Sequence, residues 1–189
     1  MKRYVFSIIL ISCFFIAGKA QPVPPGREDI TPSADEILNK AYLQAANEHK
    51  NVFVIFHASW CGWCHKMDKS MNDAACKQFF ADNYIIAHLV VDESKDKKAL
   101  ENPGASELRT KYYGDEQGIP FWLVFDKAGK LLADSKMRAA GAGPDKGANT
   151  GCPANEQEVA YFVDVLKKTS QLNADQLEII RKRFRENEQ

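Results

Sequence analysis

The stretch that decides the fold is residues 51–65, NVFVIFHASWCGWCH. Its first part, residues 52–57, is a β-branched and aromatic run ended by small residues, which predicts a buried strand. Cys61-Gly62-Trp63-Cys64 follows directly and should open a helix that runs past Met67. Free backbone N–H groups and the positive end of the helix dipole favour a thiolate at such a junction. We therefore expect Cys61 to be an exposed nucleophile and Cys64 a more buried thiol that resolves a mixed disulfide.

The segments on either side of this motif predict further helices and strands. Ser33 and Glu36 form a capping box, and an amphipathic helix follows, with Ile37, Leu38, Ala41, Tyr42 and Ala45 on one face. After the motif we expect a helical stretch capped by Asp73 that contains Phe79 and Phe80, and then a strand at residues 84–91.

The second half of the chain predicts a hairpin and two more helices. Residues 92–118 read as a loop with a short helix near residues 106–112, and residues 121–125 and 130–133 read as the two strands of a hairpin. Residues 139–153 predict a long loop. A helical period returns with Val159, Phe162, Val163 and Leu166, and Asn173 caps a last helix. This order predicts an α/β fold: a central mixed sheet with helices on both faces and a C-terminal helical extension.

The N-terminus resembles a targeting signal. Residues 1–20 combine a basic start, an apolar stretch and a small-residue cleavage site, which predicts a signal peptide and export, in a bacterium to the periplasm. Lipid anchoring at Cys13 is the less favoured alternative, because apolar residues follow it. Residues 21–32 are rich in proline and polar residues and predict a flexible leader. Residues 33–189 are then one domain.

Composition excludes some classes of partner. Without residues 1–20 the chain has 22 basic and 25 acidic residues, so its charge offers no electrostatic attraction for nucleic acid. Residues 21–189 contain four cysteines: Cys61, Cys64, Cys76 and Cys152. An exported chain permits disulfides, but the sequence does not choose among the three pairings.

The cysteine motif has rival interpretations. Cys61, Cys64 and His65 also match the pattern for covalent attachment of c-type haem, although a haem domain is expected to be mostly helical. A zinc site would need Cys76 and Cys152 without the paired spacing typical of such sites. An inert structural disulfide is the third alternative, and its ring would be very short.

Three blocks, spread over residues 52–133, together resemble the thioredoxin superfamily. The first is residues 53–64, the family's strand and active-site helix. The second is residues 90–92 with the loop that follows, and the third is Gly118-Ile119-Pro120 before a strand. The resemblance implies a thioredoxin fold with Pro120 in cis facing Cys61, and the Ile119 backbone offering hydrogen bonds to a substrate peptide.

The resemblance also implies a thiol:disulfide oxidoreductase acting on exported proteins in the reducing direction. Cys61 and Cys64 would be catalytic, and Trp60, Gly62, Trp63, Ile119 and Pro120 would bind substrate. Its partners would be disulfide or dithiol proteins and a thiol electron donor, with no nucleic acid and no membrane span in the mature chain. No metal or other cofactor is required.

The sequence departs from the thioredoxin pattern at several positions. The family's buried acid falls on Ile55 and its buried lysine on His88, so another group or water must accept the Cys64 proton. Gly62-Trp63 stands where thioredoxin has glycine and proline, so the redox potential does not carry over. A thioredoxin-fold binding module with an inert disulfide, using residues 139–153 and the tryptophans, stays open as an alternative.

Overall fold

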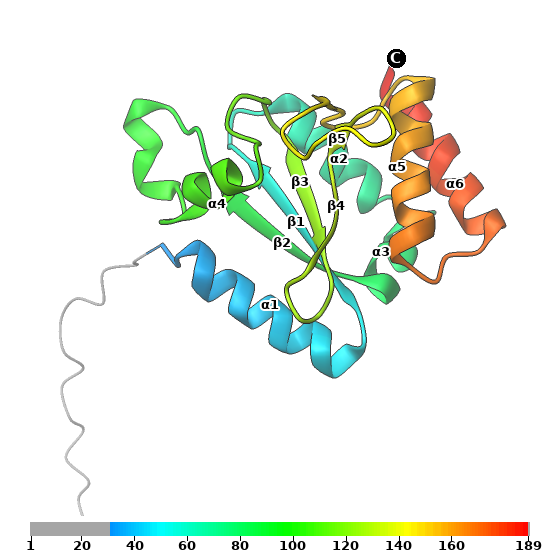
Figure 1. Cartoon of the computed structure of the whole chain (residues 1–189), viewed down its shortest axis with the longest axis horizontal. Coiled ribbons are helices and arrows are strands. Elements are labelled where there is room, and N and C mark those ends of the chain that lie inside the picture. The colour runs from blue at the N-terminus through cyan, green and yellow to red at the C-terminus, as the bar shows by residue number, and fades with distance from the viewer. Residues whose placement is uncertain (1–30, 189) are drawn as a thin grey trace, which may run out of the picture. The chain divides into compact units, whose positions relative to one another are not determined.

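Four strands form the central sheet in the computed structural model, which describes residues 31–188 (Figure 1). Their order across the sheet is β2 (Tyr84–Val90), β1 (Asn51–His57), β3 (Phe121–Phe125) and β4 (Leu131–Asp134). β1 pairs parallel with β2 and antiparallel with β3, which in turn pairs antiparallel with β4. The predicted mixed sheet and the hairpin are therefore confirmed, and β1, which ends just before the cysteine pair, is an inner strand.

Two helices cover one face of the sheet. α1 (Ala34–Glu48) and α4 (Ala105–Lys111) pack there against alternate residues of β1 and β3. Val52, Val54 and Phe56 point to this face, since successive side chains of a strand alternate.

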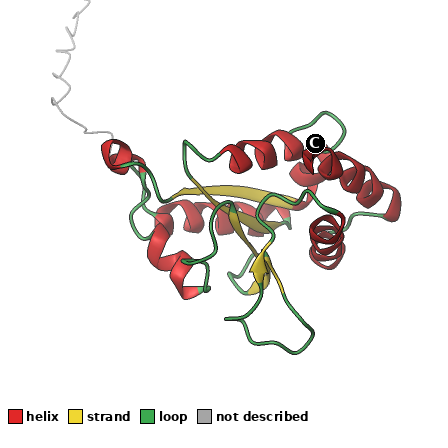
Figure 2. Cartoon of the chain, turned by 90° about the horizontal axis from the view of Figure 1, so that it is seen from above, coloured by secondary structure: helices red, strands yellow, loops and turns green. Residues whose placement is uncertain are grey.

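Four helices cover the opposite face, so the sheet lies between two helical layers (Figure 2). They are α2 (Gly62–Met71), α3 (Lys77–Asn83), α5 (Glu156–Thr169) and α6 (Ala174–Arg185), and a 3-10 turn, η2 (Glu186–Glu188), follows α6. The core on this face is aromatic: Phe53, Phe80, Trp122, Phe162 and Phe184 are all buried in one cluster. The C-terminal helices thus share a hydrophobic core with the strands that carry the cysteine motif.

Capping boxes begin three helices, α1, α5 and α6. Ser33 and Glu36 form the predicted capping box of α1, and Asn173 caps α6 together with Gln176. Asn155 caps α5 in the same way. Each cap satisfies backbone N–H groups that have no partner within the helix.

Three local predictions differ from the structure. Asp73 does not cap α3: its carboxylate accepts the Ala75 N–H in a turn, and α3 begins four residues later without a side-chain cap. Residues 92–118 contain, besides α4, a 3-10 helix, η1 (Lys95–Leu100). The long loop is pinned by a two-stranded ribbon, β5 (Lys136–Met137) paired with β6 (Ala148–Asn149).

The described part of the chain begins within the expected leader. The Thr31 hydroxyl donates to the Ala99 carbonyl oxygen at 2.8 Å, and the Pro32 carbonyl oxygen accepts from the Asn102 amide at 2.8 Å. These two residues are therefore held against the domain. The expected signal peptide, the Cys13 alternative and residues 21–30 of the leader lie outside the described residues.

Candidate active site

Cys61 and Cys64 form a disulfide at the junction of β1 and α2, with their Cα atoms 5.2 Å apart. Cys61 is the N-cap of α2, and the Cys64 N–H donates to Cys61 Sγ at 3.1 Å. The first turn of α2 thus presents a backbone donor and the positive end of its dipole to the Cys61 sulfur. Both would stabilise a thiolate there once the pair is reduced.

Both cysteines are buried, which differs from the expected exposure of Cys61. Cys61 is 3% exposed and Cys64 1% exposed, since Ala58 and Ile119 pack against them. The predicted contrast between an exposed and a buried sulfur is therefore absent from this disulfide form.

The two tryptophans are the exposed side chains of the motif. Trp60 is 59% exposed and Trp63 48% exposed. The Trp60 indole N–H donates to the Asp92 carbonyl oxygen at 2.8 Å, whereas the Trp63 ring borders a pocket and lies 4.6 Å from the Lys66 ammonium. The motif thus exposes two aromatic rings while both of its sulfurs are buried.

Ile119 packs against the two cysteines, and Pro120 follows it in the chain. The Ile119–Pro120 peptide bond is cis, and the Ile119 carbonyl oxygen is 3.6 Å from Cys61 Sγ. A pocket of about 240 Å³ is lined by Trp63, Ile119 and Pro120 together with residues of the long loop: Asn149, Thr150, Gly151 and Cys152. The structure therefore places Ile119 and Pro120 beside the cysteine motif, 55 or more positions away along the chain.

Asn149 is a residue of this site that the sequence did not reveal. Its side-chain amide donates to the carbonyl oxygens of Gln117, Gly118 and Pro120 at 3.0 to 3.2 Å. The only signal in the sequence was the length of the loop that carries it. Residues 149–152 of that loop line the pocket that Trp63 and Ile119 border.

Buried polar groups hold the segment between β1 and the cysteines. The Glu93 carboxylate accepts the Ser59 N–H at 2.5 Å and the Ser59 hydroxyl at 2.8 Å. Burial opposes ionisation of Glu93, but the hydrogen bonds from Ser59 outweigh it, so the pKa of this carboxyl lies below its ordinary value. Arg109 supports the neighbouring residue through a bidentate ion pair with Asp92, at 2.6 and 3.0 Å.

Three histidines lie on α2 and on the two strands next to it. His65 Nε2 lies 3.0 Å from the Ser59 carbonyl oxygen. His88 is exposed, and its Nε2 lies 2.9 Å from the Asp68 carboxylate. His57 is half-buried at the end of β1 with its ring 5.1 Å from that of His88, and burial, followed by the His88 charge, lowers its pKa. Ile55, at the position of the family's buried acid, is an apolar core residue.

Cys76 and Cys152 are free and buried. Burial raises the pKa of the Cys76 thiol to about 11 and that of the Cys152 thiol to about 12. The Asn187 amide donates to Cys152 Sγ at 3.4 Å. Within residues 31–188 the only disulfide is Cys61–Cys64, so neither of these thiols pairs there.

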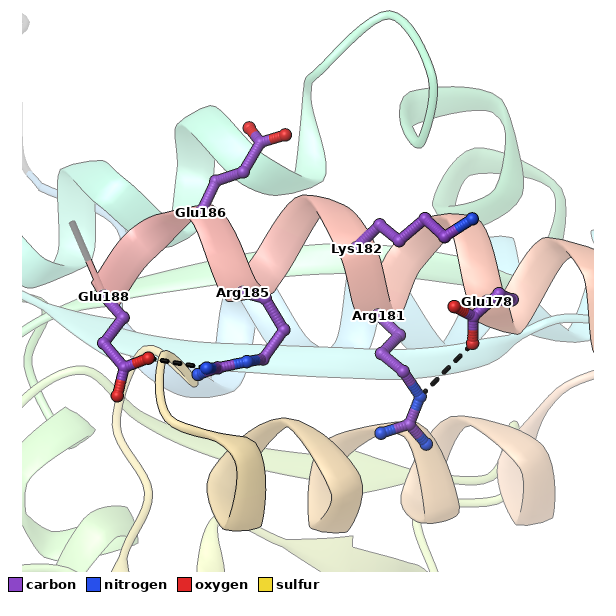
Figure 3. Close-up of a pocket in the computed structure, with 6 residues that line it drawn as sticks. All are labelled: Glu178, Arg181, Lys182, Arg185, Glu186 and Glu188. Carbon is purple, nitrogen blue, oxygen red and sulfur yellow. Dashed lines mark ion pairs between the residues drawn. The ribbon is translucent and has the colours of Figure 1, made fainter.

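Within residues 31–188, no cluster of three or more His, Cys, Asp or Glu side chains has the arrangement of a metal site. A hollow along α6 and η2 is lined by three basic and three acidic residues, of which Arg181 pairs with Glu178 at 3.4 Å and Arg185 with Glu188 at 2.6 Å (Figure 3). It therefore offers a ligand little uncompensated charge. In the same described range, no helix combines the length and apolar character needed to span a membrane.

Comparison with known proteins agrees with this geometry. Residues 34–127 match a family model described as Thioredoxin-like. Protein disulfide-isomerase A5 from Bos taurus is 31% identical over 109 residues, which are 52% of this chain and 21% of that protein. Thiol:disulfide interchange protein DsbD from Photorhabdus laumondii is 27% identical over 96 residues, 50% of this chain and 15% of that protein. The chain thus spans about a fifth or less of the length of these curated relatives.

Among solved structures, this chain matches in part a disulphide isomerase from Xylella fastidiosa Temecula1. It is 24% identical with a TM-score of 0.43, and the match covers 61% of this chain and 79% of that one. A structure named DsbH Oxidoreductase is 19% identical with a TM-score of 0.42, covering 78% of this chain and 95% of that one.

Proposed function

Since the chain carries a thioredoxin-like domain at residues 34–127, we propose that it is a thiol:disulfide oxidoreductase whose redox centre is Cys61 and Cys64. One observation carries the proposal. The two sulfurs are bonded to each other at the N-terminus of α2, where the Cys64 N–H donates to Cys61 Sγ. That donor and the helix dipole lower the free energy of a Cys61 thiolate, which is the species that attacks a disulfide.

The proposed reaction is a two-step exchange that starts from the reduced pair. The Cys61 thiolate attacks one sulfur of a substrate disulfide, so a Cys61–substrate disulfide forms and the substrate S–S bond breaks. The departing substrate sulfur takes a proton from water. Cys64 then gives its proton to water and attacks Cys61 Sγ, forming the Cys61–Cys64 disulfide and releasing the second substrate thiolate. Two electrons pass to the substrate, and a thiol donor restores the pair.

Five neighbours of the pair would bind the substrate chain. Trp63, Ile119 and Pro120 border the pocket beside the cysteines, Trp60 presents an exposed ring, and Gly62 leaves open space where a side chain would begin. Main-chain groups of Ile119 would hydrogen-bond an extended substrate segment as an added strand does. Exposed aromatic rings favour contact with a polypeptide over a small thiol.

We further propose that residues 33–189 are a single domain and that residues 1–20 direct export. Substrates would then be exported proteins, reduced with electrons from a separate thiol donor. N-terminal sequencing of the protein from a periplasmic fraction tests the second part, with a start near Gln21 expected. A lipid-modified Cys13 in the membrane fraction would replace simple cleavage with anchoring.

The test of the central proposal is a redox titration of the purified chain with an insulin-reduction assay. Wild-type protein should show a reversible two-electron couple and catalyse insulin reduction, and Cys61→Ser should lose both. Cys76→Ser is the matched control, because it removes a buried free thiol outside the pocket beside the cysteines and should keep both activities. A midpoint near about −270 mV would favour the reducing direction, and one near about −120 mV the oxidising direction.

The same preparation separates the alternative functions. A visible haem band would overturn the oxidoreductase in favour of a haem protein using Cys61, Cys64 and His65, although the observed sheet does not match the helical domain that this hypothesis expects. A colourless protein whose pair stays oxidised in dithiol buffer would favour a binding module with an inert disulfide.

A further inference from the structure

One side chain from the long loop organises the segment that faces the disulfide. Asn149 Nδ2 lies 3.1, 3.2 and 3.0 Å from the carbonyl oxygens of Gln117, Gly118 and Pro120. An amide group has two hydrogens, so three acceptors share them. The Asn149 backbone N–H donates to Gln117 Oε1 at 3.1 Å, and its Oδ1 accepts the Gly151 N–H at 3.1 Å. Both the side chain and the main chain of Asn149 are thus committed to this contact.

The segment held by Asn149 is the one that touches the reactive sulfurs. Between the three bonded carbonyls lies Ile119, whose own carbonyl oxygen is 3.6 Å from Cys61 Sγ and whose side chain packs against both cysteines. A displacement of residues 117–120 therefore changes the distance between the sulfur and any chain docked on Ile119. Such a displacement would weaken the main-chain pairing through which that chain binds.

The loop that carries Asn149 is itself firmly anchored. Asn149 is paired with Lys136 across the β5–β6 ribbon. The Lys136 side chain is fully buried, and its ammonium donates to the carbonyl oxygens of Tyr113 at 3.2 Å and Pro144 at 2.5 Å. These bonds fasten the middle of the loop to the segment after α4. These contacts hold the loop in place, so Asn149 is positioned in the absence of a substrate.

We propose that Asn149 is a positioning residue for disulfide exchange, which rests on the proposed function and deepens it. It fixes residues 117–120 so that the Ile119 main chain and the adjoining pocket form a ready edge for an extended polypeptide flanking the substrate disulfide. Main-chain pairing depends on the direction of each donor and acceptor, whereas a small disulfide needs access only to the sulfur. Asn149 thus favours polypeptide substrates over small disulfides.

The test compares two substrates with one variant. For Asn149→Ala, the KM for insulin should rise by about tenfold while kcat stays within about twofold, since the lost interaction positions the bound chain. The rate with oxidised glutathione should stay within about twofold of wild type. Asn51→Ala is the matched control: it removes an amide bond to the Thr169 carbonyl oxygen, at the opposite end of β1 from the cysteines, and should leave both rates unchanged.

The outcomes separate a failure of the positioning role of Asn149 from a failure of the proposed oxidoreductase function. A folded Asn149→Ala protein with an unchanged KM for insulin, or with both substrates slowed equally, would overturn the positioning role. If circular dichroism shows that Asn149→Ala is unfolded, Asn149→Ser, which keeps one hydrogen-bond donor, takes its place. The same changes in the KM for insulin and in the rate with oxidised glutathione are then expected. If wild-type protein reduces neither substrate, the proposed function itself fails, and the inference fails with it.

Discussion

Replacing Phe184 with alanine tests whether the C-terminal helices fold as one unit with the cysteine site. Phe184 on α6 is fully buried, with its ring centre 4.8 Å from that of Phe162 and 6.3 Å from that of Phe80. Truncating a buried phenylalanine costs about 3–5 kcal/mol, and close ring pairs place this one near about 4 kcal/mol. With a urea slope of about 2 kcal/mol per molar, the unfolding midpoint should fall by about 2 M.

The assay is urea unfolding of the oxidised chain, followed by far-ultraviolet circular dichroism and by tryptophan fluorescence. Ile179→Ala on the same helix is the control: that side chain is 39% exposed, so the midpoint should fall by less than about 0.5 M. Both probes should report one transition in each protein. Equal small shifts in the two variants, or a separate early loss of helix with the fluorescence midpoint unchanged, would refute the shared core.

Three further perturbations probe the surroundings of the site. Cys76 and Cys152, whose thiol pKa values are raised by burial to about 11 and about 12, should resist iodoacetamide at pH 8 in the reduced native protein, as mass spectrometry of the labelled chain can check. Gly114→Ala should cost about 1–3 kcal/mol in urea unfolding, because its Cβ would lie 2.5 Å from a ring carbon of the next strand. Glu93→Gln should cost about 1 kcal/mol at pH 7, where the carboxylate accepts both Ser59 bonds. Since the folded-state pKa of Glu93 is lowered, this difference should be complete above the unfolded pKa of about 4.3 and vanish as pH falls through the folded value.

Each of these perturbations has its own control. Rapid labelling of Cys152 in native protein would contradict its burial, and unfolding in urea should make both thiols reactive. Gly62→Ala is the control for Gly114→Ala. A Cβ at Gly62 meets nothing within 4 Å, so this substitution should not destabilise the fold. A pH-independent gap between Glu93→Gln and wild type would mean that the carboxylate charge contributes nothing.

Sequence patterns predicted the parts of the fold that depend on near neighbours. The capping box of Ser33 and Glu36 and the cap at Asn173 each join residues three positions apart, so the sequence contains both partners. The strand before Cys61 was equally evident, because an inner strand buried on both faces reads as a continuous apolar run.

Other features depended on partners far along the chain. Asp73 resembles a helix cap, but its carboxylate bonds the Ala75 N–H and pairs with Arg183 of α6 at 3.0 Å, a contact that no local rule contains. Cys61 is buried because Ile119, 58 positions later, lies over it. Asn149 could not be identified for the same reason: its role depends on the path of a long loop, which turns at Gly147 and Gly151 with positive φ.

The aromatic cluster under α6 also bears on the order in which the chain can fold during synthesis. β1, the cysteine pair and α2 leave the ribosome well before α6, and Phe184 follows α2 by more than a hundred residues. Until then the rings of Phe80 and Phe162 lack one of their covering partners. The nascent chain therefore carries Cys61 and Cys64 for many seconds beside an apolar surface that α6 has not yet covered.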